Sequence, residues 1–471
     1  MFIPRPEMKK EKIKTSFESK VAPVILYSAE NNKFWMEDGR GKFVGYPKAA
    51  VSDRLDFEYS YTDGDRKEYF ANVYRDDVID FVTLIGGWEK GVHEIGSKKV
   101  LVPYEQRRIK PVKGEWGIMN KLLLGMLGQE QFEYYKGWLK TWLASFYNYK
   151  FTPGQVLILV GETSSGKTLL KDIHNHIFDG GGQPLKYMTG GTGFNGELCE
   201  VCSLYIDDKL NDLGTSGKKK LKAECKEIAV AGQLRFEFKN KTAFNASPCF
   251  RLLICCNYTE DSVTVIPDID ESTKNKISIL NCKRNRMPMP SRTPNERAAF
   301  WKQIESEMPA FLYHVINEHQ ITEQFADLEE ERMGVRGYHN EKAMKFVETH
   351  SNEGKRLFAM IEALRLSDST KDEWYGSVGE LINKLKDKGI ERQATATSIG
   401  RFLNQRIACG SKLVKKVSQR RYTIDLTDNE DEPANVENEI EKNPIEDDTK
   451  VTESQEELFE DEDDGNYYGH P

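Results

Sequence analysis

Hydrophobic residues follow two different patterns along this chain, a helical spacing and short continuous runs. In residues 119–147, large apolar side chains recur at intervals of three and four, which predicts an amphipathic helix. The same spacing beyond residue 295 predicts further helix. Residues 155–160, 203–206 and 251–256 are short continuous apolar runs, which predict buried strands. The first helical stripe consists of Tyr135, Trp138, Leu139, Trp142, Leu143 and Phe146. It could stack on nucleic-acid bases, but helical spacing favours a core face.

A phosphate-binding pattern follows the first of these strands. The octapeptide is Gly161, Glu162, Thr163, Ser164, Ser165, Gly166, Lys167 and Thr168, and a helix-favouring stretch comes next. The glycines let backbone N–H groups converge on phosphates, and the lysine supplies a positive charge to them. The hydroxyl of Thr168 is a magnesium ligand in this pattern. The sequence therefore predicts a site for ATP and Mg²⁺.

Polar side chains end the next two predicted strands. Asp207 and Asp208 follow the run 203–206, and Asn257 follows the run 251–256. We assign magnesium binding to Asp207 and general-base work to Asp208. The amide of Asn257 can orient the attacking water. Two solvated aspartates at a strand tip are the alternative, which the phosphate-binding pattern about 40 residues upstream disfavours.

Residues 233–244 predict a projecting hairpin. Leu234, Phe236 and Phe238 alternate with polar neighbours, which is typical of a half-buried strand. Lys239 and Lys241 lie at the predicted turn, where they suit phosphate contact without sequence preference. Taken alone, the segment would be interpreted as a surface hairpin with solvated lysines.

The last folded unit shows the order of a winged helix-turn-helix. Helices are predicted over 354–364, 377–387 and 396–407, followed by a hairpin over 412–426. Its third helix and ribbon are rich in cations, namely Arg401, Arg406, Lys412, Lys415, Lys416, Arg420 and Arg421. From these, Arg401, Lys415 and Arg420 are the DNA-binding candidates. Many winged helices bind protein instead.

Charge is distributed unevenly along the 471 residues. The formal net charge is -8, but residues 428–471 carry 18 acidic residues and two lysines, so the remaining chain carries +8. A mildly basic body is compatible with nucleic-acid binding. The acidic segment buries too little apolar surface to fold, which predicts a disordered tail. It either solvates the protein or docks, through Leu458 and Phe459, on a basic partner or on the DNA channel.

Other features exclude several classes of protein. No apolar stretch approaches 18 residues, and the first residues lack a secretory signal pattern, so we expect a cytoplasmic protein without a membrane span. The eight cysteines are expected to be reduced. Cys199 and Cys202 could begin a zinc site, but Cys255 and Cys256 are adjacent on a strand and cannot complete it. We therefore expect buried thiols.

These motifs together resemble a known family. The series GETSSGKT, LYIDD, the segment 232–241 and LLICCN is similar to the A, B, B-prime and C motifs of superfamily 3 helicases. More narrowly, it resembles the poxvirus-type primase-helicase branch found in phages and plasmids. Tyr134–Ala144 and Arg332–His339 resemble segments that flank the ATPase of that branch, so the resemblance covers about 110–427.

The resemblance implies a replicative DNA helicase. It implies a homo-hexamer around one strand of single-stranded or forked DNA, with ATP between subunits, usually 3′ to 5′ polarity, and Lys239 and Lys241 in the DNA channel. The family's arginine pair has no counterpart in place, so Arg284 or Arg286 is expected to act in trans, with Lys276 an outside possibility that lacks the planar fork. No primase or polymerase acidic triad is evident, which implies a separate primase or polymerase chain. If phage or plasmid encoded, the protein would act in a bacterial host cell.

The predicted fold class is α/β, a P-loop ATPase core with an AAA+-like parallel sheet, helical flanks and a C-terminal winged helix-turn-helix. The predicted units are an N-terminal region of unassigned fold (1–110), a helical segment (111–150), the ATPase core (151–295), a helical extension (296–340), the winged-helix-like unit (341–427) and the acidic tail (428–471). Two alternatives to a helicase remain. One is an ATP-switched protein that binds an origin or a partner, and the other is a P-loop phosphotransferase.

Overall fold

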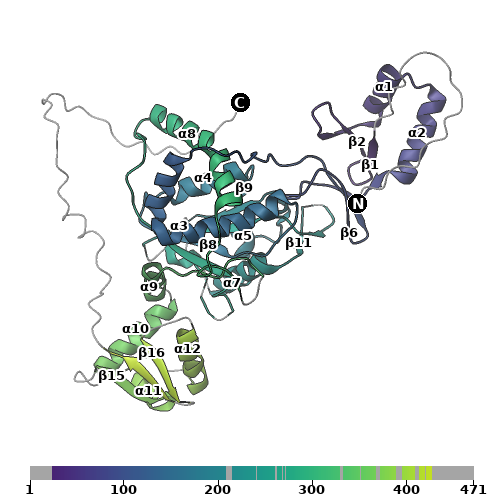
Figure 1. Cartoon of the computed structure of the whole chain (residues 1–471). Coiled ribbons are helices and arrows are strands. Elements are labelled where there is room, and N and C mark those ends of the chain that lie inside the picture. Colours follow the sequence, from purple (N-terminus) through teal and green to yellow (C-terminus); the bar gives the residue numbers. More distant parts are fainter. Residues whose placement is uncertain are drawn as a thin grey trace, which may run out of the picture.

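The structure, a computed structural model, consists of a central α/β unit with a smaller unit toward each end of the chain (Figure 1). It describes residues 24–207, 215–239, 241–259, 262–267, 269–270, 272–328, 332–350, 352–366, 372–388, 395–408, 413–418 and 421–426. Four predicted features lie outside the described residues, namely Asp208, Lys412, Arg420 and the acidic segment 428–471.

The N-terminal unit pairs a small sheet with two helices. Its strands follow the order β3-β2-β1-β4, with β4 parallel to β1. Thr62 and Asp65 form a capping box at the start of α2, which satisfies backbone N–H groups there. The core of the unit gathers around Phe34 and Phe70. Its elements are β1 (Ile25–Ser28), β2 (Lys33–Glu37), β3 (Phe43–Tyr46), α1 (Lys48–Tyr59), α2 (Asp63–Asp76) and β4 (Val78–Ile79).

The next three strands belong with the central unit. They form a separate sheet of order β5-β7-β6, and their residues Phe81, Val100 and Val102 are buried in the central core. The region 1–110, which the sequence left unassigned, therefore contains a small α/β unit and a second sheet that packs against the central core. The strands are β5 (Phe81–Val82), β6 (Gly91–Ile95) and β7 (Lys98–Val102).

The central sheet has five parallel strands in the order β14-β8-β13-β10-β9. Each long strand is buried on both faces, as continuous apolar runs predict. Successive residues point to opposite faces, so Cys255 lies in one core and Cys256 in the other. The predicted strands are thus confirmed. The predicted strands are β8 (Val156–Gly161), β10 (Ser203–Ile206) and β13 (Arg251–Asn257), and the sheet is completed by β9 (Gly181–Gly182) and β14 (Ile277–Cys282).

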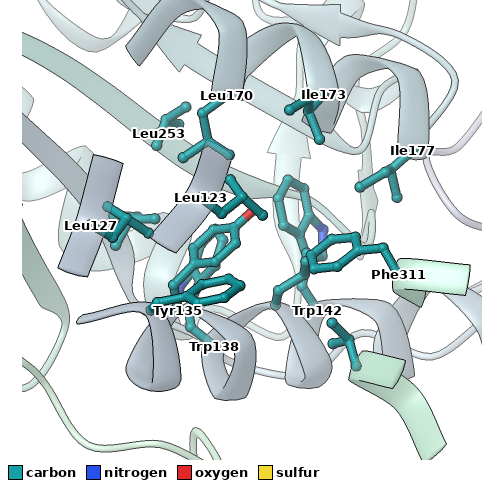
Figure 2. Close-up of a cluster of buried hydrophobic side chains, with 14 of the residues drawn as sticks. Leu123, Leu127, Tyr135, Trp138, Trp142, Leu170, Ile173, Ile177, Leu253 and Phe311 are labelled. Carbon is teal, nitrogen blue, oxygen red and sulfur yellow. The ribbon is translucent and has the colours of Figure 1, made fainter. Parts of the chain in front are cut away.

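Three helices cover one face of this sheet, namely α3 (Gly117–Tyr147), α4 (Lys167–Ile177) and α8 (Pro294–Tyr313). The aromatic stripe predicted in the first of them is core, and Trp138 and Trp142 are at most 1% exposed. Figure 2 shows these rings packed with α4 side chains and with Phe311 of α8. The stripe is therefore not available to stack on bases.

Helix α3 is broken at Gly128, whose φ of 72° is left-handed. The break lets the two halves of α3 take different directions, and the first half begins against α8. There Glu307 accepts hydrogen bonds from the backbone N–H groups of Ile118 and Met119, at 3.2 and 2.8 Å. A carboxylate at this position satisfies first-turn donors that the helix itself cannot.

The other face of the sheet is covered by shorter helices and a two-stranded hairpin. The elements are α5 (Leu185–Met188), α6 (Gly196–Cys199), α7 (Thr215–Val230), β11 (Leu234–Phe236), β12 (Phe244–Ala246), the 3-10 helix η1 (Ser262–Val265) and α9 (Glu341–His350). The boundary predicted at residue 341 assigns α9 to the C-terminal unit, whereas its Ala343 and Val347 are buried in the central core.

The outer edge of β14 is covered. The backbone N–H of Ile279 donates to Tyr338 O (2.7 Å), and its carbonyl accepts from the N–H of Asn340 (2.9 Å). Farther along the strand, the Gln131 side chain accepts from the backbone N–H of Asn281 (2.7 Å) and donates to its carbonyl (3.1 Å). The segment that follows the π-helix η2 (His314–Glu318) and a side chain from α3 thus satisfy backbone groups that an open edge would leave exposed.

The C-terminal unit has its own core and the element order helix, strand, helix, helix, ribbon. Its three predicted helices and its hairpin are present. The strand β15, which the sequence did not predict, completes a three-stranded antiparallel sheet of order β15-β17-β16. Arg406, grouped with the surface cations from the sequence, is 5% exposed. The elements are α10 (Asn352–Arg365), β15 (Glu373–Ser377), α11 (Val378–Asp387), α12 (Ala396–Ala408), β16 (Val414–Ser418) and β17 (Arg421–Asp425).

Candidate functional site

The loop between β8 and α4 is held in a tight, partly left-handed conformation. Ser164 and Gly166 have φ of 63° and 89°. A Cβ on Gly161 would lie 2.3 Å from the carbonyl oxygen of Cys282, and one on Gly166 would lie 3.0 Å from Met126 Sδ. Glycine is therefore needed at both positions of the predicted loop, at the first because of crowding and at the second also because of backbone conformation.

Lys167 is the first residue of α4 and is 7% exposed. Its ammonium donates hydrogen bonds to the carbonyl oxygens of Gly161 (2.9 Å) and Glu162 (2.7 Å), and to Ser165 Oγ (3.2 Å). The loop thus wraps around a buried positive charge at the start of a helix. The N–H groups of the first helical turn add to the positive potential at this point.

Sheet register brings the other predicted residues to the same edge. Asn257 pairs with Gly161 across β13 and β8, and Ile206, which precedes Asp207, pairs with Ile254. Burial raises the pKa of the Cys255 thiol, and the charge of Asp207 raises it further while that of Lys167 lowers it. Both charges therefore lie near Cys255. Lys167, Asp207 and Asn257 meet at the carboxyl end of the sheet.

A further carboxylate and a lysine, which the sequence analysis did not single out, lie beside this edge. Burial raises the pKa of Asp172 on α4, and the nearby negative charge of Asp207 adds to that shift. Lys171 Nζ lies 3.5 Å from Asp172 Oδ1 and 4.9 Å from the centre of the Tyr205 ring. Their position one helical turn beyond Thr168 was the signal available in the sequence.

Two oxygen-bearing side chains at this edge are of the kind that would hold a magnesium ion. Thr168 is exposed at the start of α4, and Asp207 follows β10, so a hydroxyl and a carboxylate flank the loop. Such hard oxygen ligands suit Mg²⁺, which keeps several waters when it is bound with phosphates. In the described part of the chain, no group of three or more His, Cys, Asp or Glu residues could hold a metal ion by itself.

Of the two interpretations of the cysteines, a zinc site and buried thiols, the structure agrees with buried thiols. All seven in the described residues are buried thiols. Cys199 and Cys202 lie in different cores of the central unit, so this pair does not begin a zinc site. These cysteines act as small apolar residues of the core.

The candidate arginines lie just beyond the same sheet edge. Arg284 and Arg286 are exposed on the segment after β14. That segment contacts the kinked part of α3, since the Lys283 N–H donates to Met126 O at 2.8 Å. Lys276 lies at the opposite end of β14, where its Nζ donates to Ser272 O at 3.0 Å.

The predicted hairpin is present as β11 and β12, with Phe236 opposite Phe244. Phe236 is buried, whereas Lys239 and Lys241 are exposed, as the alternation predicts. Lys241 Nζ lies 5.7 Å from the centre of the Phe238 ring. The described residues of the turn thus present two cations to solvent.

An asparagine that the sequence did not single out anchors this hairpin. Asn195, 5% exposed, donates through Nδ2 to Arg235 O (3.0 Å) and accepts through Oδ1 from the Glu237 N–H (2.7 Å). Its own N–H donates to Glu237 O at 3.0 Å. The following Gly196 leaves room for Phe238, because a Cβ there would lie 2.2 Å from that ring. Phe-Asn-Gly at 194–196 was the sequence signal.

Stacked rings join the hairpin to the sheet of β5, β6 and β7. The Phe81 and Phe244 rings stack with centres 5.4 Å apart, and Phe244 stacks on Phe238 at 5.7 Å. Trp88 Nε1 donates to Ser247 O at 2.9 Å just beyond β12. The hairpin is therefore supported from the N-terminal side of the chain as well as by Asn195.

The C-terminal unit carries the remaining candidates. Arg401 on α12 and Lys415 on β16 are exposed. Arg420, the third DNA-binding candidate, lies outside the described residues. No helix in the described part of the chain is both long and apolar enough to span a membrane.

Comparisons with known proteins identify a similar fold but no family. No protein-family model matches the chain, and no curated protein matches it. An apo structure of the C-terminal region of NrS-1, its A form, aligns with a TM-score of 0.52 at 14% identity, covering 86% of this chain and 96% of that chain. A second apo structure of that region, residues 305–718, also has a TM-score of 0.52 at 14% identity, over 86% and 95% of the two chains.

The fold is therefore shared with the NrS-1 region over most of both chains. A JCV helicase with a bound small molecule aligns less well, with a TM-score of 0.25 at 9% identity, over 42% of this chain and 52% of that chain. A likeness this remote carries no argument. The chain has the mixed α/β architecture with a parallel sheet and helical flanks that the sequence predicts.

Proposed function

We propose that this protein is an ATP-dependent DNA helicase of the superfamily 3 type, in the poxvirus-like branch, acting in the replication of a phage, plasmid or other mobile element. The convergence of Lys167, Asp207 and Asn257 at one sheet edge carries the proposal. Because this edge also holds the glycine loop and a helix start, it suits hydrolysis of a triphosphate.

The residues divide the chemistry of hydrolysis among themselves. Residues 161–168 bind the phosphates, with Lys167 neutralising the charge that shifts toward the leaving group. Thr168 and Asp207 would hold the magnesium ion, which supplies further charge neutralisation when bound. Asp208 takes a proton from the attacking water, and the Asn257 amide orients that water. Arg284 or Arg286 would reach the site of a neighbouring copy in a homo-hexamer.

The lysine hairpin couples this site to DNA. Lys239 and Lys241 contact phosphates of single-stranded or forked DNA, independently of sequence. The anchoring by Asn195 and the stacked rings supports this role, because a phosphate-gripping turn transmits force only if its base is fixed. Translocation is 3′ to 5′, and a separate chain supplies the primase or polymerase activity.

The C-terminal unit acts in DNA recognition as a winged helix. Its order of α10, β15, α11, α12 and the β16–β17 ribbon supports that assignment. Arg401, Lys415 and Arg420 are its proposed DNA contacts. The same unit favours the second candidate function, an ATP-switched protein that binds an origin or partner without unwinding.

Unwinding of a forked DNA distinguishes the two functions. The wild type should separate the strands with ATP and Mg²⁺, and Lys167→Ala should reduce the rate by about 100-fold or more. Lys186→Ala, an exposed lysine in α5, is the matched control and should unwind normally. ATP-dependent DNA binding without strand separation by the wild type would establish the switch and reject the helicase.

A further inference from the structure

The three-stranded sheet of the C-terminal unit has one covered face and one open face. Trp374, Tyr422, Ile424 and Val414 are buried against the helices. Residues that alternate with them point away. In register, Tyr375 lies opposite Thr423, which lies opposite Lys415, and Arg421 lies opposite both Ser377 and Ser418. The open face, meaning these six residues together with Glu373 and Asp425, extends across all three strands, with a register shift on β16 between Lys416 and Ser418.

An aromatic ring and a guanidinium stand together on the open face. Tyr375 is 54% exposed. The Arg421 guanidinium carbon lies 5.2 Å from the centre of that ring, and the Arg421 side chain is itself exposed. An arginine over a tyrosine holds the ring in place and leaves a stacking surface beside a positive charge.

The charge on this sheet is graded along the strands. Lys415 is exposed on β16 in the same row as Tyr375, whereas Lys416 lies opposite the buried Tyr422 and so does not belong to the open face. Glu373 and Asp425 lie opposite each other on the open face, two residues along their strands from Tyr375 and Thr423, so the positive charge is confined to the end that carries Arg421. The end of the face that carries Arg421 and Lys415 suits a polyanion that also carries flat rings.

We propose that the open face binds single-stranded DNA, with one base stacked on Tyr375 and the flanking phosphates near Arg421 and Lys415. Unpaired bases can turn toward a ring on a flat sheet, whereas the bases of a duplex are stacked on one another. The inference rests on the proposed function only in taking DNA as the ligand. It places the contact on the sheet, which carries the proposed DNA contact Lys415 but not Arg401 of α12.

Binding of a labelled oligothymidylate to the full chain without nucleotide tests this assignment. Tyr375→Ala should weaken affinity about fivefold or more, the loss expected for one base–aromatic stack. Tyr375→Phe should stay within about twofold, because stacking needs the ring but not the hydroxyl. Phe57→Ala removes a ring that is 89% exposed in the N-terminal unit and should have no effect. Equal affinity of Tyr375→Ala and wild type would overturn the proposal.

Photo-crosslinking gives a readout that does not depend on affinity or on the stability of a variant. An oligonucleotide with 5-iodouracil should form an adduct on Tyr375 of the wild-type chain. Adducts elsewhere with none on Tyr375 would overturn the assignment. A photoreactive phenylalanine at position 375 that links, at saturating DNA, to the chain's own segment 428–471 or to a second copy would assign the face to that occupant.

The two proposals can fail separately. Because the binding and crosslinking assays are carried out without ATP, a protein that fails to unwind forks can still show the stack on Tyr375. Conversely, normal unwinding together with unchanged oligothymidylate affinity in Tyr375→Ala would reject this surface and leave the helicase proposal intact. An equal loss of duplex and single-strand affinity in that variant would mean a backbone contact, which also overturns the stack.

Discussion

The side chain of Asn195 occupies the place of a third strand beside Glu237, accepting its N–H at 2.7 Å while donating to the carbonyl of Arg235 at 3.0 Å. These bonds fix the base of the lysine hairpin to the segment that precedes α6. An asparagine is suited to the task because its amide offers a donor and an acceptor in the same plane, as a peptide group does.

Asn195→Ala should therefore loosen the hairpin without changing its lysines. Removing both bonds leaves a donor and an acceptor unpaired, at a cost of about 1–3 kcal/mol each where they are buried. Hydrogen exchange of residues 234–246 should accelerate, and single-strand affinity should fall. Asn245→Ala, an exposed asparagine on β12, is the matched control. Unaltered exchange in Asn195→Ala would mean that the aromatic stack alone holds the hairpin.

Lys239→Ala combined with Lys241→Ala should reduce the salt dependence of single-strand binding. Binding releases fewer counterions when a phosphate contact is lost. The slope of log affinity against log salt should therefore become shallower by about 1.4 for two contacts. Titrations at several salt concentrations measure that slope. Lys33→Ala with Lys67→Ala, two exposed lysines of the N-terminal unit, should leave it unchanged. A wild-type slope in the hairpin variant would exclude these lysines from the DNA path.

Asp207→Asn and Asp208→Asn should separate metal binding from proton transfer. Loss of a carboxylate ligand should raise the magnesium concentration needed for turnover, whereas loss of the base should abolish turnover at every magnesium concentration. Both variants should still bind nucleotide. Hydrolysis measured across a magnesium series, with the exposed Asp76→Asn as control, distinguishes them. Full hydrolysis by Asp208→Asn would show that the base is another residue.

His174 gives the central unit a predictable pH dependence. It is fully buried, with Nε2 2.8 Å from the hydroxyl of Tyr135, and burial lowers its pKa from 6.5 to about 3. Between these values the unfolded chain binds a proton that the folded chain does not. The contribution of His174 to the free energy of unfolding is therefore fully present above about pH 6.5 and is lost as the pH decreases toward 3.

The expected loss from this histidine is about 2 kcal/mol between pH 6.5 and 5. Denaturation followed by tryptophan fluorescence measures it, since Trp138 and Trp142 contact the histidine ring. His174→Gln should show a smaller decrease in stability than the wild type over that interval, and the partly exposed His93→Gln should match the wild type. Equal decreases in wild type and His174→Gln would place the acid sensitivity elsewhere.

Local pattern predicted much of this fold because the main elements are long or strongly marked. The apolar runs at β8, β10 and β13 could form little else, and the three-to-four spacing of α3 is unambiguous. The meeting of Lys167, Asp207 and Asn257 was also predictable, since parallel strands end at one edge.

What the sequence did not reveal depends on contacts between distant residues. Strand β15 has only Trp374 and Gly376 on its inner side, and it exists because β17 pairs with it. Arg406 is a charged residue of a type expected at the surface, but its place on α12 buries it. Asn195 acts on residues about 40 positions away, so no local period marks it.

The covered edge of β14 limits how copies of this chain can associate. With Tyr338, Asn340 and Gln131 bonded along that strand, a neighbour cannot extend the central sheet there by adding a strand of its own. Subunits that meet on this side must do so through side chains and loops. If the proposed helicase forms a ring, a joint of this kind can change at each round of hydrolysis without breaking backbone hydrogen bonds between subunits.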